Sequence, residues 1–356
     1  MKHIFTIHSP ITFLMAFSIA RQEKLNQEDV VVISSNYTLP IPFGMVIPAF
    51  SEINQSWRAK FASFNVGKAF DFYVKDIIGS SKFTAYVDIM HTYQKLLVTH
   101  ENCKDFHFFE EGTDSYMLPQ SLEDFTRTSV STQFRNKKYP NNLREVLRTL
   151  RGYTSALHSL PYHSQSYQYE KTRKYYCLSN YCYPEINSAQ KIQVKPNFDK
   201  KELNILSSSI QLNNAIVIVE ETYPDKYGLT DEEYKRILGL TFKKLVIAKD
   251  NSEIYLKLRP AKKDLDSRLT RLLDELGFKF NIIPNNTLAE GLFINSQNLK
   301  VVGFVSSLLM YASIFGHDGY SMIHLMKNKQ KTRFDSINGF DKLVYHLENT
   351  PVNNKN

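Results

Sequence analysis

Short apolar runs alternate with longer amphipathic segments from the start of the chain. Residues 3–7 predict a strand, His8-Ser9-Pro10 interrupts it, and residues 11–22 predict a helix that Pro10 can start because its φ angle is already helical. Residues 29–34 predict a second strand, almost entirely apolar as in a buried parallel sheet. Strand, turn, helix and strand in this order open a Rossmann-like unit, although the first turn lacks the G-x-G-x-x-G fingerprint of dinucleotide sites.

The middle of the chain is less regular. Residues 52–78 and 82–99 carry helical periodicity, and the aromatic run Phe106 to Phe109 predicts a buried strand. Residues 122–157 are polar and basic and predict helical pieces. Residues 161–184 are rich in tyrosine and poor in aliphatic residues, which predicts an irregular crossing between domains. These tyrosines are expected to pack together, with contact to a bound sugar as the alternative.

The second half of the chain repeats the alternation of strands and helices. The predicted strands are 214–220, 252–258, 278–283 and 299–304, and the predicted helices are 230–249, 264–276, a short stretch from Glu290, and Ser306 to 315. A chain of 356 residues exceeds one typical core, so two domains are expected. We therefore predict an α/β protein with two Rossmann-like domains facing a central cleft, at residues 1–185 and 186–356.

Composition and charge narrow the classes of partner. The formal net charge of +8 favours anionic partners: a nucleotide phosphate, an acidic sugar, or an anionic membrane surface with which the chain would associate peripherally. No nucleic-acid-binding motif is visible, so nucleic acid is not an expected partner. The 3 cysteines form neither a disulfide framework nor two pairs of metal ligands, which predicts a reducing, cytoplasmic location without a zinc site. No apolar segment has the length of a membrane span, and the apolar N-terminus lacks a signal-peptide cleavage site.

The clearest candidate for chemistry is Glu110-Glu111-Gly112, directly after the aromatic strand. In an open α/β sheet the ligand crevice lies beyond the carboxyl ends of the strands, where both acids would stand. Like charges beside an apolar wall disfavour double ionisation, so one carboxylate can act as a base near neutral pH. Strand alternation allows only one of the two to face the crevice. The alternative is a solvated turn that contains two acids.

Three places in the second domain are candidates for phosphate or ribose binding. Lys257 and Arg259 are two residues apart at a strand end and would share a face. Ser306 and Ser307 stand at a helix start, where hydroxyls, backbone N–H groups and the helix dipole favour an anion. Glu290 at another helix start would hold a ribose hydroxyl. The alternatives are surface charges, a simple N-cap and a first-turn acid, respectively.

These motifs, in this order, resemble a known series. Glu110-Glu111-Gly112, Lys257-Leu258-Arg259-Pro260 and Gly303-Phe304-Val305-Ser306-Ser307 are similar to the motifs of bacterial sialyltransferases, in particular the lipooligosaccharide sialyltransferases and the capsular polysialyltransferases. Those families carry an acid-acid-Gly motif, a His-Pro motif and a Ser-Ser or Ser-Thr pair. The opening Ile7-His8-Ser9-Pro10 and the segment 284–290 are similar as well, so the resemblance extends from residue 3 to about 316.

The resemblance implies the GT-B fold and inverting, metal-independent transfer of sialic acid from CMP-sialic acid, without a cofactor. The acceptor would be a hydroxyl of a surface glycan or glycolipid: lipooligosaccharide, O-antigen or capsule. It also implies a catalytic base in the first, acceptor-side domain, with Glu110 preferred and Glu111 positioning the loop. The implied donor-binding residues are Ser9, Lys257, Arg259, Pro260, Glu290, Gly303, Ser306 and Ser307.

One position departs from the family pattern. Arg259 precedes Pro260 where the family has histidine. Arginine can grip a phosphate through two N–H donors, but it does not readily deliver a proton. Two alternatives to sialic acid transfer therefore stay open: transfer of another CMP-activated nonulosonic acid or Kdo, and non-catalytic binding of a nucleotide or carbohydrate.

Overall fold

The computed structural model divides the chain into two compact units, Met1–Asn197 and Phe198–Asn356. It describes residues 1–50, 66–88, 92–98, 100–117, 173–184, 186–245, 253–259, 267–327 and 336–347. The boundary follows Asn197, whereas the sequence prediction placed it after residue 185. The predictions for 52–65, 122–157 and 161–172 lie outside the described residues.

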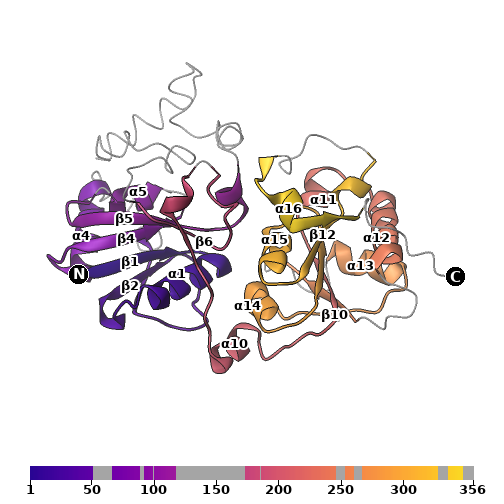
Figure 1. Ribbon diagram of the computed structural model, residues 1–356, viewed down its shortest axis with the longest axis horizontal. Coiled ribbons are helices and arrows are strands. Elements are labelled where there is room, and N and C mark those ends of the chain that lie inside the picture. Colours follow the sequence, from indigo (N-terminus) through magenta and orange to yellow (C-terminus); the bar gives the residue numbers. More distant parts are fainter. Residues whose placement is uncertain are drawn as a thin grey trace, which may run out of the picture. The chain divides into compact units, whose positions relative to one another are not determined.

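Unit 1 contains a parallel sheet with the strand order β3-β2-β1-β4-β5-β6-β7 among the described residues (Figure 1). The strands are β1 Lys2–Ile7, β2 Val30–Ser34, β3 Met45–Pro48, β4 Phe83–Val87, β5 Cys103–Phe109, β6 Tyr175–Cys177 and β7 Lys191–Gln193. The helices are α1 Pro10–Gln22, α4 Val66–Ile78 and α5 Thr92–Val98, with 3-10 turns η1 Gln27–Asp29, η2 Thr113–Tyr116 and η4 Ser188–Gln190.

The opening of unit 1 follows directly from its sequence. Strand β2 is buried at all five positions, as its apolar run predicts for the interior of a parallel sheet. Helix α1 begins with Pro10 after the N-cap Ser9, whose side chain accepts a hydrogen bond from the Thr12 N–H. Ten consecutive residues of α1, from Ile11 to Ala20, are buried. The predicted Rossmann-like start is therefore confirmed.

Two predictions for unit 1 are wrong. Residues 82–99 do not form one helix: β4 (Phe83–Val87) comes first and α5 (Thr92–Val98) follows. The aromatic and β-branched residues of β4 are buried between β1 and β5, and that sheet environment outweighs the helical periodicity. The described part of 161–184 is not an irregular crossing either, because β6 (Tyr175–Cys177) pairs with both β5 and β7. Tyr175 and Tyr176 are fully buried, as expected for packing residues.

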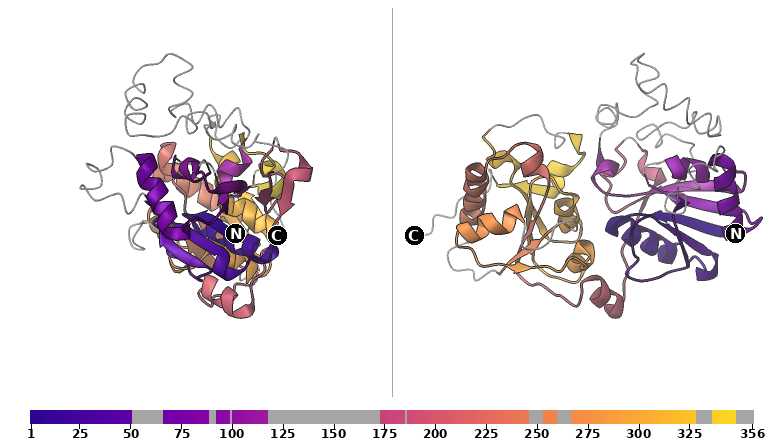
Figure 2. Two further views of the ribbon diagram at one scale, coloured as in Figure 1. Left: turned by 90° about the vertical axis from the view of Figure 1, so that its left-hand side faces the viewer. Right: turned by 180° about the vertical axis from the view of Figure 1, so that it is seen from behind.

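Unit 2 contains a second parallel sheet, with the order β10-β9-β8-β11-β12-β13 among the described residues (Figures 1 and 2). Its strands are β8 Ile216–Val219, β9 Ile254–Lys257, β10 Asn281–Ile282, β11 Lys300–Gly303, β12 Asp318–Ser321 and β13 Val344–His346. Its helices are α10 Lys200–Leu206, α11 Tyr223–Lys226, α12 Asp231–Leu245, α13 Arg268–Glu275, α14 Ala289–Ile294, α15 Ser307–Ile314 and α16 Phe340–Leu343, with the 3-10 turn η6 Ile323–Leu325.

The predicted alternation in the second half of the chain is confirmed, with shorter elements. Strands β12 and β13 were not predicted; β12 has glycine and serine at its two buried positions, and β13 is only three residues long. Figure 2 shows helices packed against the sheet in each unit. No helix in the described ranges combines the length and the apolar character that a membrane crossing requires.

Both sheets reverse their strand order at one point. In unit 1 the chain builds outward from β1 to β3 and then returns to place β4 on the other side of β1. In unit 2 it builds from β8 to β10 and returns to place β11 beside β8. Ligands of open α/β sheets bind beyond the carboxyl ends of the strands at such a reversal. The turns after β1, β4, β8 and β11 are therefore the expected positions of a ligand site.

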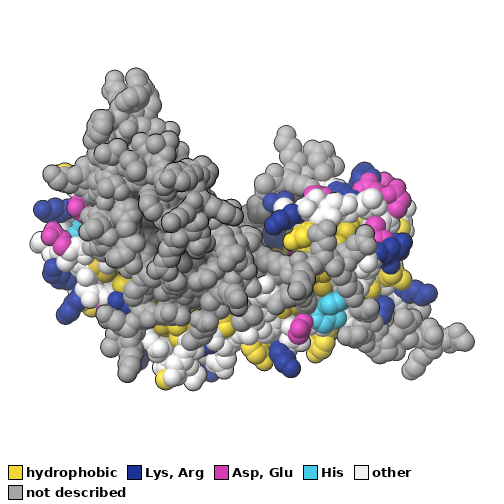
Figure 3. Space-filling view, turned by 90° about the horizontal axis from the view of Figure 1, so that it is seen from above, with side chains coloured by type: hydrophobic (Ala, Val, Ile, Leu, Met, Phe, Trp, Pro, Cys, Tyr) yellow, Lys and Arg dark blue, Asp and Glu magenta, His cyan; other side chains and the backbone are white. Residues whose placement is uncertain are grey.

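The face drawn in Figure 3 carries side chains of both charges. In the view of Figure 3, acidic and basic side chains of the described residues lie intermixed. The net charge of +8 therefore says less about the site than the individual groups at the strand ends do.

Candidate active site

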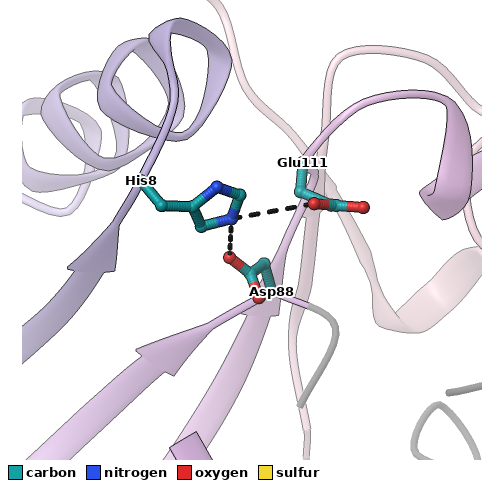
Figure 4. A group of neighbouring side chains, drawn as sticks. All are labelled: His8, Asp88 and Glu111. Carbon is teal, nitrogen blue, oxygen red and sulfur yellow. Dashed lines mark hydrogen bonds and ion pairs between the residues drawn. The ribbon is translucent and has the colours of Figure 1, made fainter. Parts of the chain in front are cut away.

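His8, Asp88 and Glu111 come together at the strand reversal of unit 1 (Figure 4). His8 follows β1, Asp88 follows β4, and Glu111 stands two residues beyond β5. These three strands are neighbours in the sheet and are parallel, so their carboxyl ends meet at one edge.

The three side chains form a short polar chain. His8 Nε2 lies 2.6 Å from Asp88 Oδ2 and 3.7 Å from Glu111 Oε2. The Asp88 side chain is fully buried, and its Oδ1 accepts a hydrogen bond of 2.7 Å from the Gln94 amide. Asp88 is thus fixed from two sides. The side chains of His8 and Glu111 are 30% and 11% exposed, which leaves them within reach of a ligand.

The charge of His8 follows from its neighbours. Burial is the largest influence and lowers its pKa, but the hydrogen bond and charge of Asp88 and the charge of Glu111 outweigh it. The pKa of His8 is therefore raised above its ordinary value. Near neutral pH this favours an imidazolium that is held between two carboxylates.

Glu110 points elsewhere. Its side chain is fully buried: Oε1 accepts a hydrogen bond of 2.8 Å from the Tyr116 hydroxyl, and Oε2 accepts one of 2.8 Å from the Leu178 N–H. Its own N–H donates to the Tyr176 carbonyl at 3.0 Å. Glu110 therefore joins the ends of β5 and β6 inside unit 1, and the preference for Glu110 over Glu111 as the catalytic base does not fit this geometry.

The turn after the acid pair sets the direction of Glu111. Gly112 has φ 132° and ψ −149°, a backbone conformation that essentially only glycine adopts. The Glu111 N–H donates to the Ser115 hydroxyl at 3.1 Å, which holds the turn closed. The backbone conformation at position 112 thus explains why a glycine follows the acid pair: it allows Glu111 to turn toward His8.

Two further features adjoin this cluster. A cavity of about 220 Å³ lies next to His8 and Gln94, and most of its wall is apolar, with Phe50, Phe70 and Tyr73 among the lining residues. The nitrogen and the two carboxylates of the cluster lie within 4.8 Å of one another, the chemistry of a divalent-cation site. However, at 2.6 Å His8 Nε2 and Asp88 Oδ2 are hydrogen-bonded to each other, closer than two ligands 2.0–2.2 Å from one metal would normally stand.

Ser9, predicted to bind the donor, lies beside this cluster in unit 1. Its hydroxyl lies 3.0 Å from the Thr12 hydroxyl and accepts from the Thr12 N–H at 3.4 Å. Ser9 therefore closes the first turn of α1, and this turn is what carries His8 at the end of β1.

The second group of predicted residues meets at the reversal of unit 2. Gly303 ends β11, Ser306 is the N-cap of α15, and Ser307 is its first residue. The Ser306 hydroxyl accepts from the Leu308 N–H at 3.2 Å, while the Ser307 hydroxyl bonds to no other described residue. Glu221, from the neighbouring β8 end, adds a carboxylate that is not among the predicted site residues.

Lys257 and Glu290 are both buried and do not form a surface site. Lys257 ends β9, and its Nζ donates to the carbonyls of Thr287 at 2.8 Å and Pro284 at 3.2 Å. Burial lowers the pKa of Lys257, against the charge of Glu290, and burial raises the pKa of Glu290, against the charge of Lys257. The two hydrogen bonds of Lys257 fasten β9 to the segment that precedes α14, so Lys257 is not available beside Arg259 as a surface group for phosphate.

Arg259 remains available for a ligand. Its backbone N–H donates to Glu220 Oε2 at 3.1 Å, and Glu220 Oε1 accepts from the Ser267 hydroxyl at 2.7 Å. The Arg259 guanidinium has no hydrogen bond or ion pair with any residue that the structure describes. Pro260 lies outside the described residues.

Sequence reasoning did not identify His8 or Asp88 as site residues. The available signal was positional: each is the first polar side chain after an apolar strand that ends at the sheet reversal. The sequence gives His8 as a break after the first strand and as part of the family-like segment Ile7-His8-Ser9-Pro10, but not as a site residue, and Asp88 lies in a segment predicted to be helical.

Comparison with known proteins adds a family and a fold. A family model described as alpha-2,8-polysialyltransferase (POLYST) matches residues 67–320, which include Glu111, Arg259 and the Ser306-Ser307 turn. Comparison with curated protein sequences gives no match.

Several solved structures are similar. An alpha/beta-galactoside alpha-2,3-sialyltransferase from Photobacterium phosphoreum has a TM-score of 0.53 and 12% identity, covering 98% of this chain and 99% of that chain. The GT-B domain of a sialyltransferase from Photobacterium damselae has a TM-score of 0.43 and 12% identity, covering 87% and 88%. The UDP-GlcNAc 2-epimerase of Methanocaldococcus jannaschii has a TM-score of 0.42 and 12% identity, covering 90% and 83%. The first likeness shows the fold, and the two Rossmann-like domains of a GT-B protein are confirmed.

Proposed function

The chain belongs to the alpha-2,8-polysialyltransferase family, and we propose that it moves sialic acid from CMP-sialic acid to a hydroxyl of a surface glycan, with inversion and without a metal ion. It is a sialyltransferase, one of the glycosyltransferases. The observation that carries the catalytic part of the proposal is the cluster of His8, Asp88 and Glu111 at the strand reversal of unit 1. The nucleotide part rests on the turn of Ser306 and Ser307 in unit 2.

Glu111 is the proposed base. Inverting transfer needs a group that takes the proton of the acceptor hydroxyl while its oxygen attacks the anomeric carbon. The Glu111 carboxylate is partly exposed and stands 3.7 Å from His8 Nε2. His8 acts as a positioning residue for Glu111, and the buried Asp88 holds the ring of His8 through the 2.6 Å contact. Glu110 supports the strand end from the interior.

Ser306, Ser307 and Arg259 are the proposed donor residues. As the bond to the anomeric carbon breaks, negative charge grows on the CMP phosphate and must be offset. Hydroxyls and backbone N–H groups at the start of α15 can bond to the phosphate oxygens. The Arg259 guanidinium offers two parallel N–H donors and a fixed positive charge. These groups offset the charge on leaving CMP without requiring proton transfer from a histidine at position 259.

We propose that no metal or cofactor takes part. The cluster of unit 1 has ligand-type atoms, but the hydrogen bond between His8 and Asp88 already satisfies the two closest of them. The phosphate-side groups named above offset the charge that a metal would otherwise offset.

The family description supports α-2,8 linkage and chain extension, so the proposed acceptor is a terminal sialic acid on a capsular glycan. Lipooligosaccharide and O-antigen are the alternative acceptors, and another nonulosonic acid or Kdo is the alternative sugar. Peripheral association with an anionic membrane surface fits a glycolipid acceptor and the net charge of +8.

The proposal is tested by CMP release from CMP-sialic acid with a short α-2,8-linked oligosialic acid as acceptor, in the presence of EDTA. We expect turnover by the wild type and by Glu232→Gln, which removes an exposed carboxylate from α12. We expect no turnover by Glu111→Gln, with the affinity for CMP retained, because a base acts in the transition state only. Full turnover by Glu111→Gln would remove the base role. Transfer from a different CMP-sugar in a donor panel would replace sialic acid as the substrate.

A further inference from the structure

Glu221 occupies the backbone N–H groups at the start of helix α15. Its Oε1 accepts from the Phe304 N–H at 2.5 Å and its Oε2 accepts from the Val305 N–H at 2.9 Å. These two N–H groups belong to the turn on which the proposed donor phosphate depends.

Gly303 makes this approach sterically feasible. A Cβ atom at position 303 would lie 2.4 Å from Glu221 Oε1, so any larger residue there would push the Glu221 carboxylate out of its present position. The glycine of the Gly303-to-Ser307 segment therefore leaves room for an anionic oxygen against the backbone. In the structure, the oxygen in this space is Glu221 Oε1.

Glu221 is placed there by the sheet order. It follows β8, which pairs directly with β11 at the strand reversal of unit 2. The carboxylate thus reaches the turn from the next strand end, and the residue itself is only half-buried.

The donor groups that Glu221 uses are those that bind phosphate in other α/β proteins. We propose that Glu221 is an internal stand-in for the donor phosphate: its carboxylate holds the N–H groups of Phe304 and Val305, and CMP-sugar binding displaces it. This inference rests on the proposed function, since it takes the same turn as the phosphate site. In this role Glu221 keeps the turn in place when no donor is bound. It also competes with CMP and so lowers the affinity for CMP.

The energetics favour such an exchange. Burial raises the pKa of Glu221 to about 7, although backbone hydrogen bonds at the turn act to lower it. The carboxylate is therefore held less firmly than its contacts alone would indicate. A phosphate brings more oxygens and more negative charge to the same N–H groups, and the Ser307 hydroxyl can add a bond to it.

The experiment compares CMP binding to the wild type, Glu221→Ala and Glu232→Gln by calorimetry. Glu232 lies exposed on α12 and controls for the loss of one negative charge. We expect Glu221→Ala to bind CMP about tenfold more tightly, the equivalent of one charge-assisted hydrogen bond no longer being displaced. We expect Glu232→Gln to remain within about twofold of the wild type, because salt screens an exposed charge.

Glu221→Gln is the second variant, because it keeps the size of the side chain and one acceptor oxygen. We expect it to tighten CMP binding by less than Glu221→Ala does. Equal or weaker CMP binding by both variants, while Ser306→Ala and Ser307→Ala weaken it, would overturn the stand-in role and leave the donor site intact. Absence of CMP binding in the wild type and in all variants would remove the donor site, and the stand-in role with it. Inorganic phosphate as a second probe reports the N–H groups without cytidine contacts and should follow the same order.

Discussion

Glu110 and Glu111 are consecutive in the chain, yet their carboxylates lie in opposite environments. The Glu110 carboxylate is buried in unit 1 and accepts hydrogen bonds from the Tyr116 hydroxyl and the Leu178 N–H, whereas Glu111 faces His8 at the strand end. The alternation of a strand continued by one residue produces this separation, and Gly112 completes it. One acid of the pair therefore supports the structure, and the other is available for chemistry.

The first prediction separates these two roles. Glu110→Gln should lower the free energy of unfolding by about 1–3 kcal/mol, because an amide cannot accept both buried hydrogen bonds as a carboxylate does. Glu111→Gln should change it by less than about 0.5 kcal/mol and abolish transfer. Denaturant unfolding and CMP release measure the two effects.

Tyr116→Phe provides the control for Glu110. Because Tyr116 and Glu110 share one hydrogen bond, the two substitutions together should cost less than the sum of their separate effects. Full additivity, together with lost turnover in a stably folded Glu110→Gln, would return the base role to Glu110.

The second prediction concerns pH and His8. Its pKa is raised in the folded protein, so its protonated form adds stability that is fully present below the ordinary histidine pKa of 6.5. That contribution is lost as the pH rises through the higher folded value. The difference in unfolding free energy between the wild type and His8→Gln should therefore be largest near pH 5.5 and shrink toward pH 9.

His100 is a matched control of opposite sign. Burial, the largest influence, lowers its pKa, so its protonation opposes folding as the pH falls. The difference in unfolding free energy between the wild type and His100→Gln should therefore increase from pH 5.5 toward pH 9, opposite to the change expected for His8→Gln. A pH-independent effect of His8→Gln would mean that His8 carries no charge in the cluster.

The third prediction tests the turn at the start of α15. The double change Ser306→Ala and Ser307→Ala should weaken CMP binding by about 1–3 kcal/mol through lost hydroxyl bonds to a charged phosphate. Ser306→Ala alone also removes an N-cap and should cost about 1 kcal/mol of stability, whereas Ser307→Ala should not. Ser306→Thr keeps a capping hydroxyl and should preserve the stability. Unchanged CMP affinity in the double variant would exclude these serines from the site.

The sequence predicts the buried strands of the two sheets well, for a physical reason. Runs such as Val30 to Ile33 and Ile216 to Val219 are apolar at every position, and only the interior of a parallel sheet buries both faces of a strand. Because parallel strands align their carboxyl ends, motifs that follow such strands are expected at one edge. Glu111, Arg259 and Ser307 therefore stand at the strand ends where the motifs predicted them.

What the sequence cannot predict depends on distant segments. Asp88 becomes a site residue only because β4 pairs between β1 and β5. Lys257 looks like a surface charge until the segment before α14 packs against it, and Glu221 looks like a loop acid until β11 lies beside β8. In each case the side chain's partner comes from an element dozens of residues away.

The fourth prediction follows from the burial of Lys257. Lys257→Met should lower stability, because the carbonyls of Pro284 and Thr287 lose their donor and Glu290 loses its counter-charge. The affinity of the remaining folded protein for CMP should stay within about threefold. The double change with Glu290→Gln should recover part of the stability, as it removes the unpaired acid. A large loss of CMP affinity without a loss of stability would restore Lys257 as a donor residue.

The last prediction concerns Arg259, which replaces the histidine of the family pattern. Arg259→Lys should keep partial activity, because a positive charge remains while the two-pronged grip on phosphate is lost. Arg259→Ala should lose much more, about 100-fold in kcat, with a smaller change in KM, since the charge on CMP grows only in the transition state. The pH profile of kcat should show a rising limb from the acidic base and no falling limb near neutrality from a histidine acid at this position. A falling limb that persists in Arg259→Lys would assign the proton to another group. His317 would not be that group, because it is buried and its ring contacts the Phe293 carbonyl at 2.7 Å; His8 would be the first residue to test.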